Sequence, residues 1–244
     1  MNARLVEAAA KGDLFTIQFL LEEGEDVNVQ DEDGFSALFL AAQHGHTSIA
    51  RALLDLGADP NLANKDGTTP LMAAAYKGRL TAVQAMLEHG AEVRSLNHDG
   101  YSALMFAAVN GHPEVVRILS EAEPKVLRDK GKGGWTALQW AALMGHAEVV
   151  SVLLERGAEI DHPGQDGSTA LMLAASKGHG AVVRLLLEKG ADPSLKNQSN
   201  QDALDLADTC GGEVVELLQR ASKKPDRARR KPWEPPSPLD GSEG

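Results

Sequence analysis

The feature that most constrains the fold is a turn followed by two short helices, a unit that recurs about every 33 residues. A turn residue stands at the same place in each copy, and the successive intervals are 33, 33, 34, 33 and 33 residues, counted over Gly34, Gly67, Gly100, Gly134, Gly167 and Asn200. A fixed period of this length is the signature of a stacked repeat protein, in which each unit packs only against its neighbours. The sequence therefore predicts an elongated all-α array.

The segment from Asp99 to Leu119 shows the local signals of one unit. The turn precedes Ser102, whose hydroxyl is suited to accept the free N–H groups at a helix start. Alanine residues let this first helix approach its neighbours closely, and Gly111 is suited to end it in a left-handed conformation. Ser or Thr recurs at the helix start in every full unit, at Ser36, Thr69, Ser102, Thr136 and Thr169.

These signals divide the chain into units. We expect an N-terminal capping repeat over residues 1–29, with a more polar outer face, and a degenerate C-terminal capping repeat over 196–221. Five full repeats lie between them, at 30–62, 63–95, 96–129, 130–162 and 163–195. Residues 222–244 carry five prolines and little apolar content, which predicts a disordered basic and proline-rich tail.

The motifs TTPLMAAA, GHPEVVRIL, GHAEVVSVLLERGAE and GHGAVVRLLLEKGAD resemble those of ankyrin repeats over about residues 2–221. The resemblance implies an ankyrin-repeat solenoid of about seven stacked units with hairpin tips and a capping repeat at each end. One departure is the loss of the family's His after T-P-L, which predicts a more apolar junction; the residues found there are Phe39, Met72, Met105, Gln139 and Met172. The unit 96–129 also lacks the G-A-D ending, so we expect a shorter second helix and a looser, basic hairpin.

Charge and cysteine content limit the partners and the compartment. The net charge is −11, and because residues 221–244 contribute +2, residues 1–220 carry −13. Such an acidic body repels phosphate backbones, so we expect no general nucleic-acid binding. A single cysteine, Cys210, favours a reducing compartment. With no signal peptide and no long apolar stretch, we expect a monomeric, soluble protein of the cytoplasm, the nucleus or both, with no membrane partner.

Catalytic and metal-binding patterns are missing from the sequence, so we expect no enzyme activity, no catalytic residues and no cofactor or metal. Histidines do recur with the repeat, at His46, His112, His146 and His179. Repeat stacking would place neighbouring copies roughly 10 Å apart, too far to share one metal ion. We interpret them as structural residues that begin each second helix.

In ankyrin repeats, partner contacts come mostly from residues beside the turn glycine and from the two residues after the alanine pair. Carried over by position, the central units offer an apolar strip with two flanking lysines, and the partner-binding candidates are Tyr76, Lys77, Tyr101, Val109, Lys132, Trp135, Leu143 and Met144. Tyr101 and Trp135 have an alternative reading, in which they only brace adjacent hairpins. Trp140 and Phe106 stand where the family has a core Leu and are interpreted as packing residues.

Weaker signals lie outside this strip. Lys125, Arg128, Lys130 and Lys132 form a basic hairpin that suits an acidic partner segment or, alternatively, only offsets nearby acids. The tail offers KKPDRARRK, a run typical of nuclear import signals, and a proline-directed phosphorylation site at Ser237. Candidate hydroxylation sites, by resemblance, are Asn28 and Asn61.

Two functions remain open from the sequence. The first is a non-enzymatic protein–protein interaction module, acting as adaptor, scaffold or inhibitor, that binds a partner segment on the concave face of the central repeats. The alternative is a sensor of RNA or an anionic small ligand, in which the groove aromatics stack on a base and lysines meet phosphates.

Overall fold

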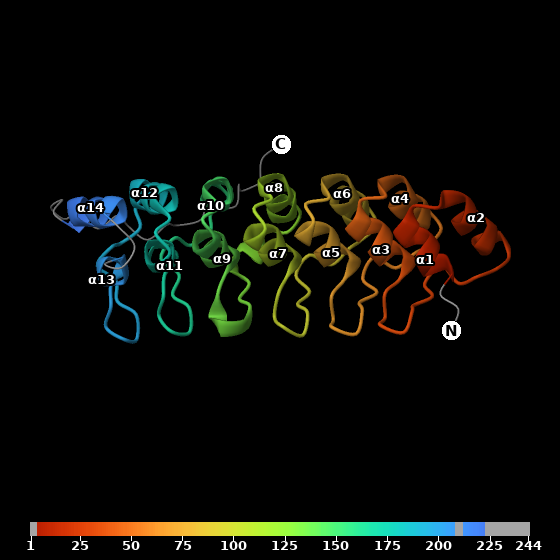
Figure 1. The fold of residues 1–244 in the computed structure, drawn as a ribbon, viewed down its shortest axis with the longest axis horizontal. Helices are drawn as coiled ribbons and strands as arrows, with labels where there is room; N and C mark the ends of the chain where they lie inside the picture. The colour runs from red at the N-terminus through yellow and green to blue at the C-terminus, as the bar shows by residue number, and fades with distance from the viewer. Residues whose placement is uncertain (1–3, 208–211, 223–244) are drawn as a thin grey trace, which may run out of the picture.

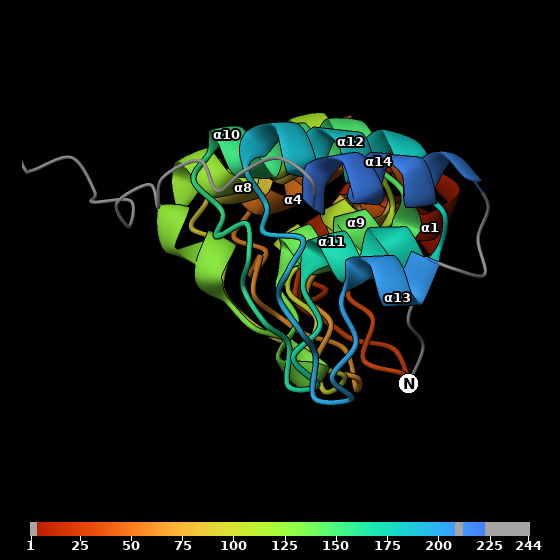
Figure 2. The same cartoon turned by 90° about the vertical axis from the view of Figure 1, so that its left-hand side faces the viewer.

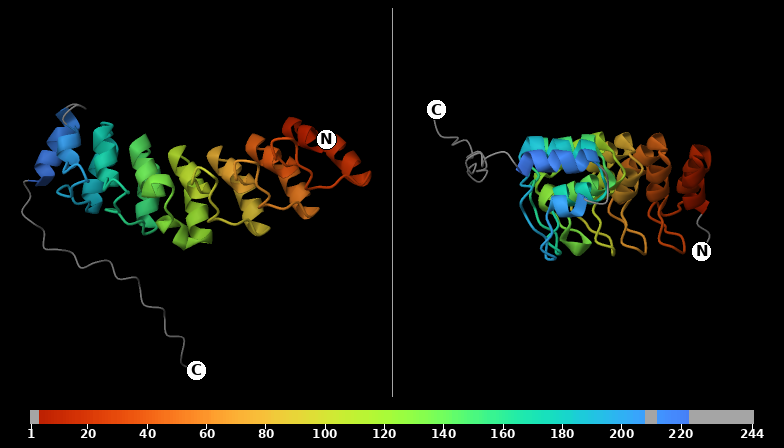
Figure 3. Two further views of the ribbon diagram at one scale, coloured as in Figure 1. Left: turned by 90° about the horizontal axis from the view of Figure 1, so that it is seen from below. Right: turned by 60° about the vertical axis from the view of Figure 1, so that its left-hand side comes forward.

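The computed structural model describes residues 4–207 and 212–222 as a curved row of helix pairs (Figures 1 and 3). The first helix of each pair forms one layer and the second helix another, and the hairpins project from the side of the first helices (Figure 2). The first helices are α1 (Arg4–Lys11), α3 (Ala37–His44), α5 (Pro70–Tyr76), α7 (Ala103–Val109), α9 (Ala137–Met144), α11 (Ala170–Ser176) and α13 (Ala203–Ala207). The second helices are α2 (Leu14–Glu22), α4 (Thr47–Asp55), α6 (Leu80–Glu88), α8 (Pro113–Ala122), α10 (Ala147–Glu155), α12 (Gly180–Lys189) and α14 (Gly212–Ser222).

Helix starts follow the Ser and Thr signals. The hydroxyl of Ser36 accepts the amide of Phe39 at 3.1 Å, and Thr69, Ser102 and Thr169 make the same bond in their units. In the unit 130–162 a capping box starts the helix, and in it the Gln139 side-chain oxygen accepts the backbone N–H of Thr136 at 2.9 Å. At the hairpin tips, Asn200 has φ +60°, so this asparagine adopts the left-handed turn conformation that glycine takes in the other units.

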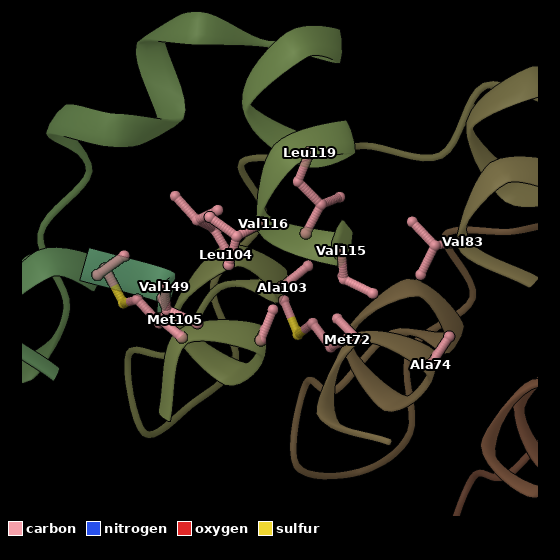
Figure 4. Close-up of a cluster of buried hydrophobic side chains, with 14 of the residues drawn as sticks. Met72, Ala74, Val83, Ala103, Leu104, Met105, Val115, Val116, Leu119 and Val149 are labelled. Carbon is pink, nitrogen blue, oxygen red and sulfur yellow. The ribbon is translucent and has the colours of Figure 1, made fainter. Parts of the chain in front are cut away.

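The core is a continuous row of alanine, leucine, valine and methionine side chains between the two layers (Figure 4). Met72 and Met105, which replace the family's His, are each 1 % exposed, and this confirms the more apolar junction. Gln139 is the polar member of the set and is also 1 % exposed. Its Nε2 donates to the Ser168 carbonyl at 2.7 Å, so the buried amide is hydrogen-bonded across the repeat boundary.

The repeated histidines join adjacent units. His112 begins α8 as its N-cap, and its Nε2 bonds the Tyr76 carbonyl of the preceding unit at 3.1 Å. His46, His146 and His179 make the equivalent bond to the unit before them. The structural interpretation of these histidines is thus confirmed. Among residues 4–207 and 212–222, no three His, Cys, Asp or Glu side chains gather as a metal site would require.

Two local expectations are wrong. The second helix of the unit 96–129, α8, has 10 residues and is not shorter than those of the other full repeats, which have 9 or 10. The chain after it is not loose, because the 3₁₀ turn η1 (Pro124–Arg128) buries Val126 and Leu127 to 1 % and 7 % exposure. This compact turn absorbs the extra residue of the unit. A second 3₁₀ turn, η2 (Lys132–Gly134), forms the next hairpin tip.

The N-terminal repeat does not have the polar outer face that we expected. Phe15 and Phe19 on α2 are 79 % and 48 % exposed. The apolar residues of α2 are spread over more sides of the helix than its neighbours, α1 and the adjacent unit, can cover. Ile17 and Leu20 therefore turn inward, while the phenylalanines stay in solvent.

Some sequence expectations concern segments outside the described residues. They are the tail with its basic run and Ser237, and Cys210 near the end of the chain. In the described part of the chain, none of the helices combines the length and apolar character that a membrane-spanning segment requires.

Candidate partner-binding site

A row of five aromatic rings runs across three consecutive units on the side of the first helices and hairpins. Tyr76 meets Phe106 edge-on at 5.7 Å between ring centroids, and Phe106 stacks on Tyr101 at 5.2 Å. Tyr101 is 5.3 Å from Trp140, which lies 4.8 Å from Trp135. Contacts of this length are favourable aromatic pairs, so the rings support one another across the unit boundaries. The row is only partly covered by the protein, and Tyr76, at one end of it, is 43 % exposed.

The Trp135 end of the row opens into a groove of about 640 Å³. The groove lies between hairpin tips and the start of the first helices, and its lining is Asp99, Tyr101, Lys132, Gly133, Trp135, Trp140, Gln165 and Asp166. Three rings thus form an apolar floor and charged groups form the rim. Grooves of this size with an apolar floor and a few polar groups are typical binding sites.

The charged rim carries two carboxylates and one ammonium group. Burial raises the pKa of Tyr101, and the negative charge of Asp99 raises it further. Burial also acts to raise the pKa of Asp166, but the Ser168 hydroxyl and amide donate hydrogen bonds to its carboxylate and hold the pKa below the ordinary value. Asp166 is therefore ionised at neutral pH, and the Tyr101 hydroxyl is neutral.

Three of the eight candidate residues meet in the groove: Tyr101, Lys132 and Trp135. Tyr76 and Lys77 lie at the opposite end of the aromatic row, where the Lys77 ammonium is 5.1 Å from the Tyr76 ring centroid. This distance allows a cation–π contact.

The other three candidates lie at the far ends of the first helices. Leu143 and Met144 end the eight-residue α9, which is about 12 Å long at 1.5 Å per residue, whereas Trp135 precedes the start of this helix. Val109 ends α7 in the same way. Met144 is 43 % exposed, whereas Val109 and Leu143 are half-buried. The apolar strip expected from the sequence is thus an aromatic groove with a separate aliphatic end.

Trp140 was interpreted as a packing residue, and the structure gives it two roles. It packs against the core with Phe106, yet it also lines the groove between Tyr101 and Trp135. A signal was present in the sequence, since Trp135 and Trp140 are five residues apart around a helix start. Their ring contact depends on the turn geometry, which the spacing alone did not specify.

The basic hairpin does not gather on the groove. Lys125 and Arg128 line a different hollow with Arg156, near the end of α10. Asp129 of the same hairpin accepts both Nε and a terminal nitrogen of Arg94. Lys132 is therefore the member of this basic group that lines the aromatic groove.

Asn28 and Asn61 bridge successive loops. The Asn28 side-chain oxygen accepts the Asp59 amide at 2.8 Å, and that of Asn61 accepts the Glu92 amide at 2.7 Å. Asp161 takes the same position three units after Asn61 and accepts the Asp192 amide at 3.1 Å. Both asparagines thus have a structural role in addition to their place as candidate modification sites.

Comparisons with known proteins agree with this architecture. A family model described as ankyrin repeats (3 copies) matches residues 5–97 and 90–164, and one described as ankyrin repeats (many copies) matches residues 153–207. The chain is similar to the human ASB11 ankyrin repeat domain, with TM-score 0.83 and 33 % identity over 91 % of this chain and 98 % of that one. The ankyrin repeat domain of Bcl-3, a member of the IkappaB protein family, has TM-score 0.76 and 27 % identity over 88 % of this chain and 97 % of that one.

Curated relatives match over a short segment. Cortactin-binding protein 2 from Ovis aries and from Mus musculus is 50 % identical over 48 residues, which is 19 % of this chain. The match spans only 3 % of the length of those relatives. The similarity therefore extends to repeat units and not to the whole relatives.

Proposed function

This chain belongs to the ankyrin repeat family, whose domains are in general protein-interaction modules, and we propose that it is a non-enzymatic module of this kind. It holds a segment of a partner protein along the first helices and hairpins of its central units. In the cell it acts as an adaptor, scaffold or inhibitor.

The observation that carries this proposal is the partly exposed aromatic row with its groove. Tyrosine and tryptophan are enriched among the residues that dominate the energy of protein interfaces. The rings are held in place by their mutual contacts, so little conformational entropy is lost when a partner covers them. Met144 extends the apolar surface at the other end of α9 and suits an adaptable contact.

The alternative function, a sensor of RNA or of an anionic ligand, has less support. The rings of the groove are able to stack on a base. However, Asp99 and Asp166 stand on the same rim, and they oppose phosphate groups where Lys132 alone would attract them.

The test is affinity capture from cell lysate with the full chain as bait. Wild type is compared with Trp135→Ala and with Met144→Asp, and bound proteins are identified by mass spectrometry. Phe15→Ala is the matched control, because Phe15 is a 79 % exposed aromatic residue far from the groove. We expect proteins retained by wild type and by the control to be lost from both Trp135→Ala and Met144→Asp.

Helicity and thermal melting are measured on each bait. They are expected to stay near wild type, especially for Met144→Asp, because Met144 is 43 % exposed. If all four baits retain the same proteins, the first-helix face is not the binding surface and the proposal is wrong.

A further inference from the structure

The groove is built by a substitution in the neighbouring hairpin. In four other units the first tip residue is Asp or Asn, and its side chain accepts backbone amides of the tip, as Asn64 does from Asp66 and Thr68. In the unit 130–162 it is Gly131. In the unit 163–195 this residue is Gly164. A Cβ on Gly164 would stand 2.6 Å from both Cδ1 and Nε1 of Trp135, closer than real Cβ contacts allow. The glycine therefore provides the space that the Trp135 indole occupies.

The hairpins on the two sides of the groove are also linked differently. Elsewhere a backbone bond joins consecutive tips, as between the Lys65 amide and the Asp33 carbonyl at 3.1 Å, or the Gln165 amide and the Gly133 carbonyl at 2.9 Å. Within the described residues, no such bond joins Asp99 to Lys132. The tip of the unit 96–129 thus lacks one link to the next tip at the place where the groove opens.

Two carboxylates at this opening are not neutralised by the protein. In the described part of the chain, neither Asp99 nor Asp166 forms an ion pair. Asp166 accepts hydrogen bonds from Ser168 and keeps its negative charge. With Lys132, the rim has a formal charge of −1, within a body that is itself acidic. The groove thus favours a cation.

We propose that the groove is a subsite for an arginine side chain of the partner protein, an inference that rests on the proposed function and specifies its ligand. A planar guanidinium stacks on aromatic faces while its N–H groups donate to carboxylates. The floor of Tyr101, Trp135 and Trp140 supplies the faces, and Asp99 and Asp166 supply the acceptors. A trimethylated lysine would use the rings but has no N–H group for the carboxylates.

The test follows the tryptophan indole N–H resonances of the full ¹⁵N-labelled chain by NMR. The chain has three tryptophans, Trp135, Trp140 and Trp233, and substitution of each assigns its signal. The probes are acetyl-arginine amide, its neutral analogue acetyl-citrulline amide, and acetyl-trimethyllysine amide, each at millimolar concentrations. We expect saturable shifts of the Trp135 and Trp140 signals with arginine, a constant Trp233 signal, and weaker binding of the other two probes.

Charge variants measure the contribution of the rim. Asp99→Asn and Asp166→Asn should each raise the Kd for the arginine probe about two- to fivefold, the range of an exposed ion pair. Lys132→Met should lower it. Asp33→Asn, at the turn position of Asp99 but in another unit, is the control and should leave the Kd unchanged.

Three results would overturn the inference. They are equal binding of arginine and citrulline, tighter binding of trimethyllysine, and Kd values that do not respond to Asp99→Asn and Asp166→Asn. Tighter arginine binding after Arg227, Arg229 and Arg230 are replaced by Gln would assign the subsite to the chain's own tail and not to a partner. If the capture experiment still loses partners with Trp135→Ala while the arginine probe fails, the proposed function stands and this inference alone is wrong.

Discussion

Substitution of Gly164 by alanine tests whether the position of the Trp135 indole is what makes the site. The added Cβ would lie 2.6 Å from Cδ1 and Nε1 of Trp135, whereas ordinary contact begins at 3.4 Å. The indole must therefore retreat by about 0.8 Å, away from the hairpin tip. Gly164 has no left-handed φ, so alanine brings no backbone strain there.

The expected stability change is small because two effects oppose each other. Disturbing the Trp135–Trp140 ring contact costs at most about 0.5–1.5 kcal/mol. Replacing a glycine at a compatible backbone position stabilises by about 0.4–1 kcal/mol through the unfolded chain. The free energy of unfolding should thus stay within about 1 kcal/mol of wild type. Binding should weaken about tenfold, equal to about 1.4 kcal/mol, because the displaced indole in the groove no longer fits the partner.

The assay combines chemical unfolding followed by circular dichroism, tryptophan near-UV signals and partner affinity. Gly212→Ala is the matched control, because a Cβ on Gly212 meets no atom within 4 Å. It should be slightly stabilised and bind as wild type does. The reasoning is refuted if Gly164→Ala matches this control in stability, near-UV signal and affinity.

Three further predictions concern how the units are joined. Gly78→Ala should lower the free energy of unfolding by about 1 kcal/mol more than Gly90→Ala. Both glycines have a left-handed φ, but only at Gly78 would a Cβ, 2.6 Å from the His112 ring, break the hydrogen bond between His112 and the Tyr76 carbonyl. Urea unfolding of the two variants checks this, and equal losses would contradict it. Asp161→Asn should raise the melting temperature at pH 7, because burial raises the pKa of Asp161 in the folded protein. The folded state therefore favours the protonated carboxyl: this stabilisation is complete below the ordinary pKa of 3.8 and is lost as the pH rises through the folded pKa. The advantage of the variant should accordingly vanish in melts recorded below pH 3.8. Gln139→Met should cost about 1 kcal/mol in urea unfolding because the Thr136 amide loses its acceptor, and a variant as stable as wild type would show that the bond contributes nothing.

The departures from expectation share a physical origin. Trp135 and Gly164 meet although they lie in different units, and the sequence period does not say which side chain fills the space left by a missing Cβ. Trp140 occupies a position read as core, and its partial exposure follows from the width of the opening beside it. At the N-terminus, the apolar residues of α2 exceed what one neighbouring unit can bury, so Phe15 remains in solvent.

What the sequence determined by itself is the repeat: the period, the helix starts at Ser and Thr, the turns, and the histidines that begin the second helices. These follow from interactions within a few residues, such as N-caps and left-handed turns, or from contacts between adjacent units that the repetition itself reveals. Only the tertiary structure decided which rings line a groove, which carboxylates stand on its rim, and where the basic hairpin turns. Those depend on side chains about 30 residues apart, whose contacts are set by the stacking of units and not by the order of residues within one.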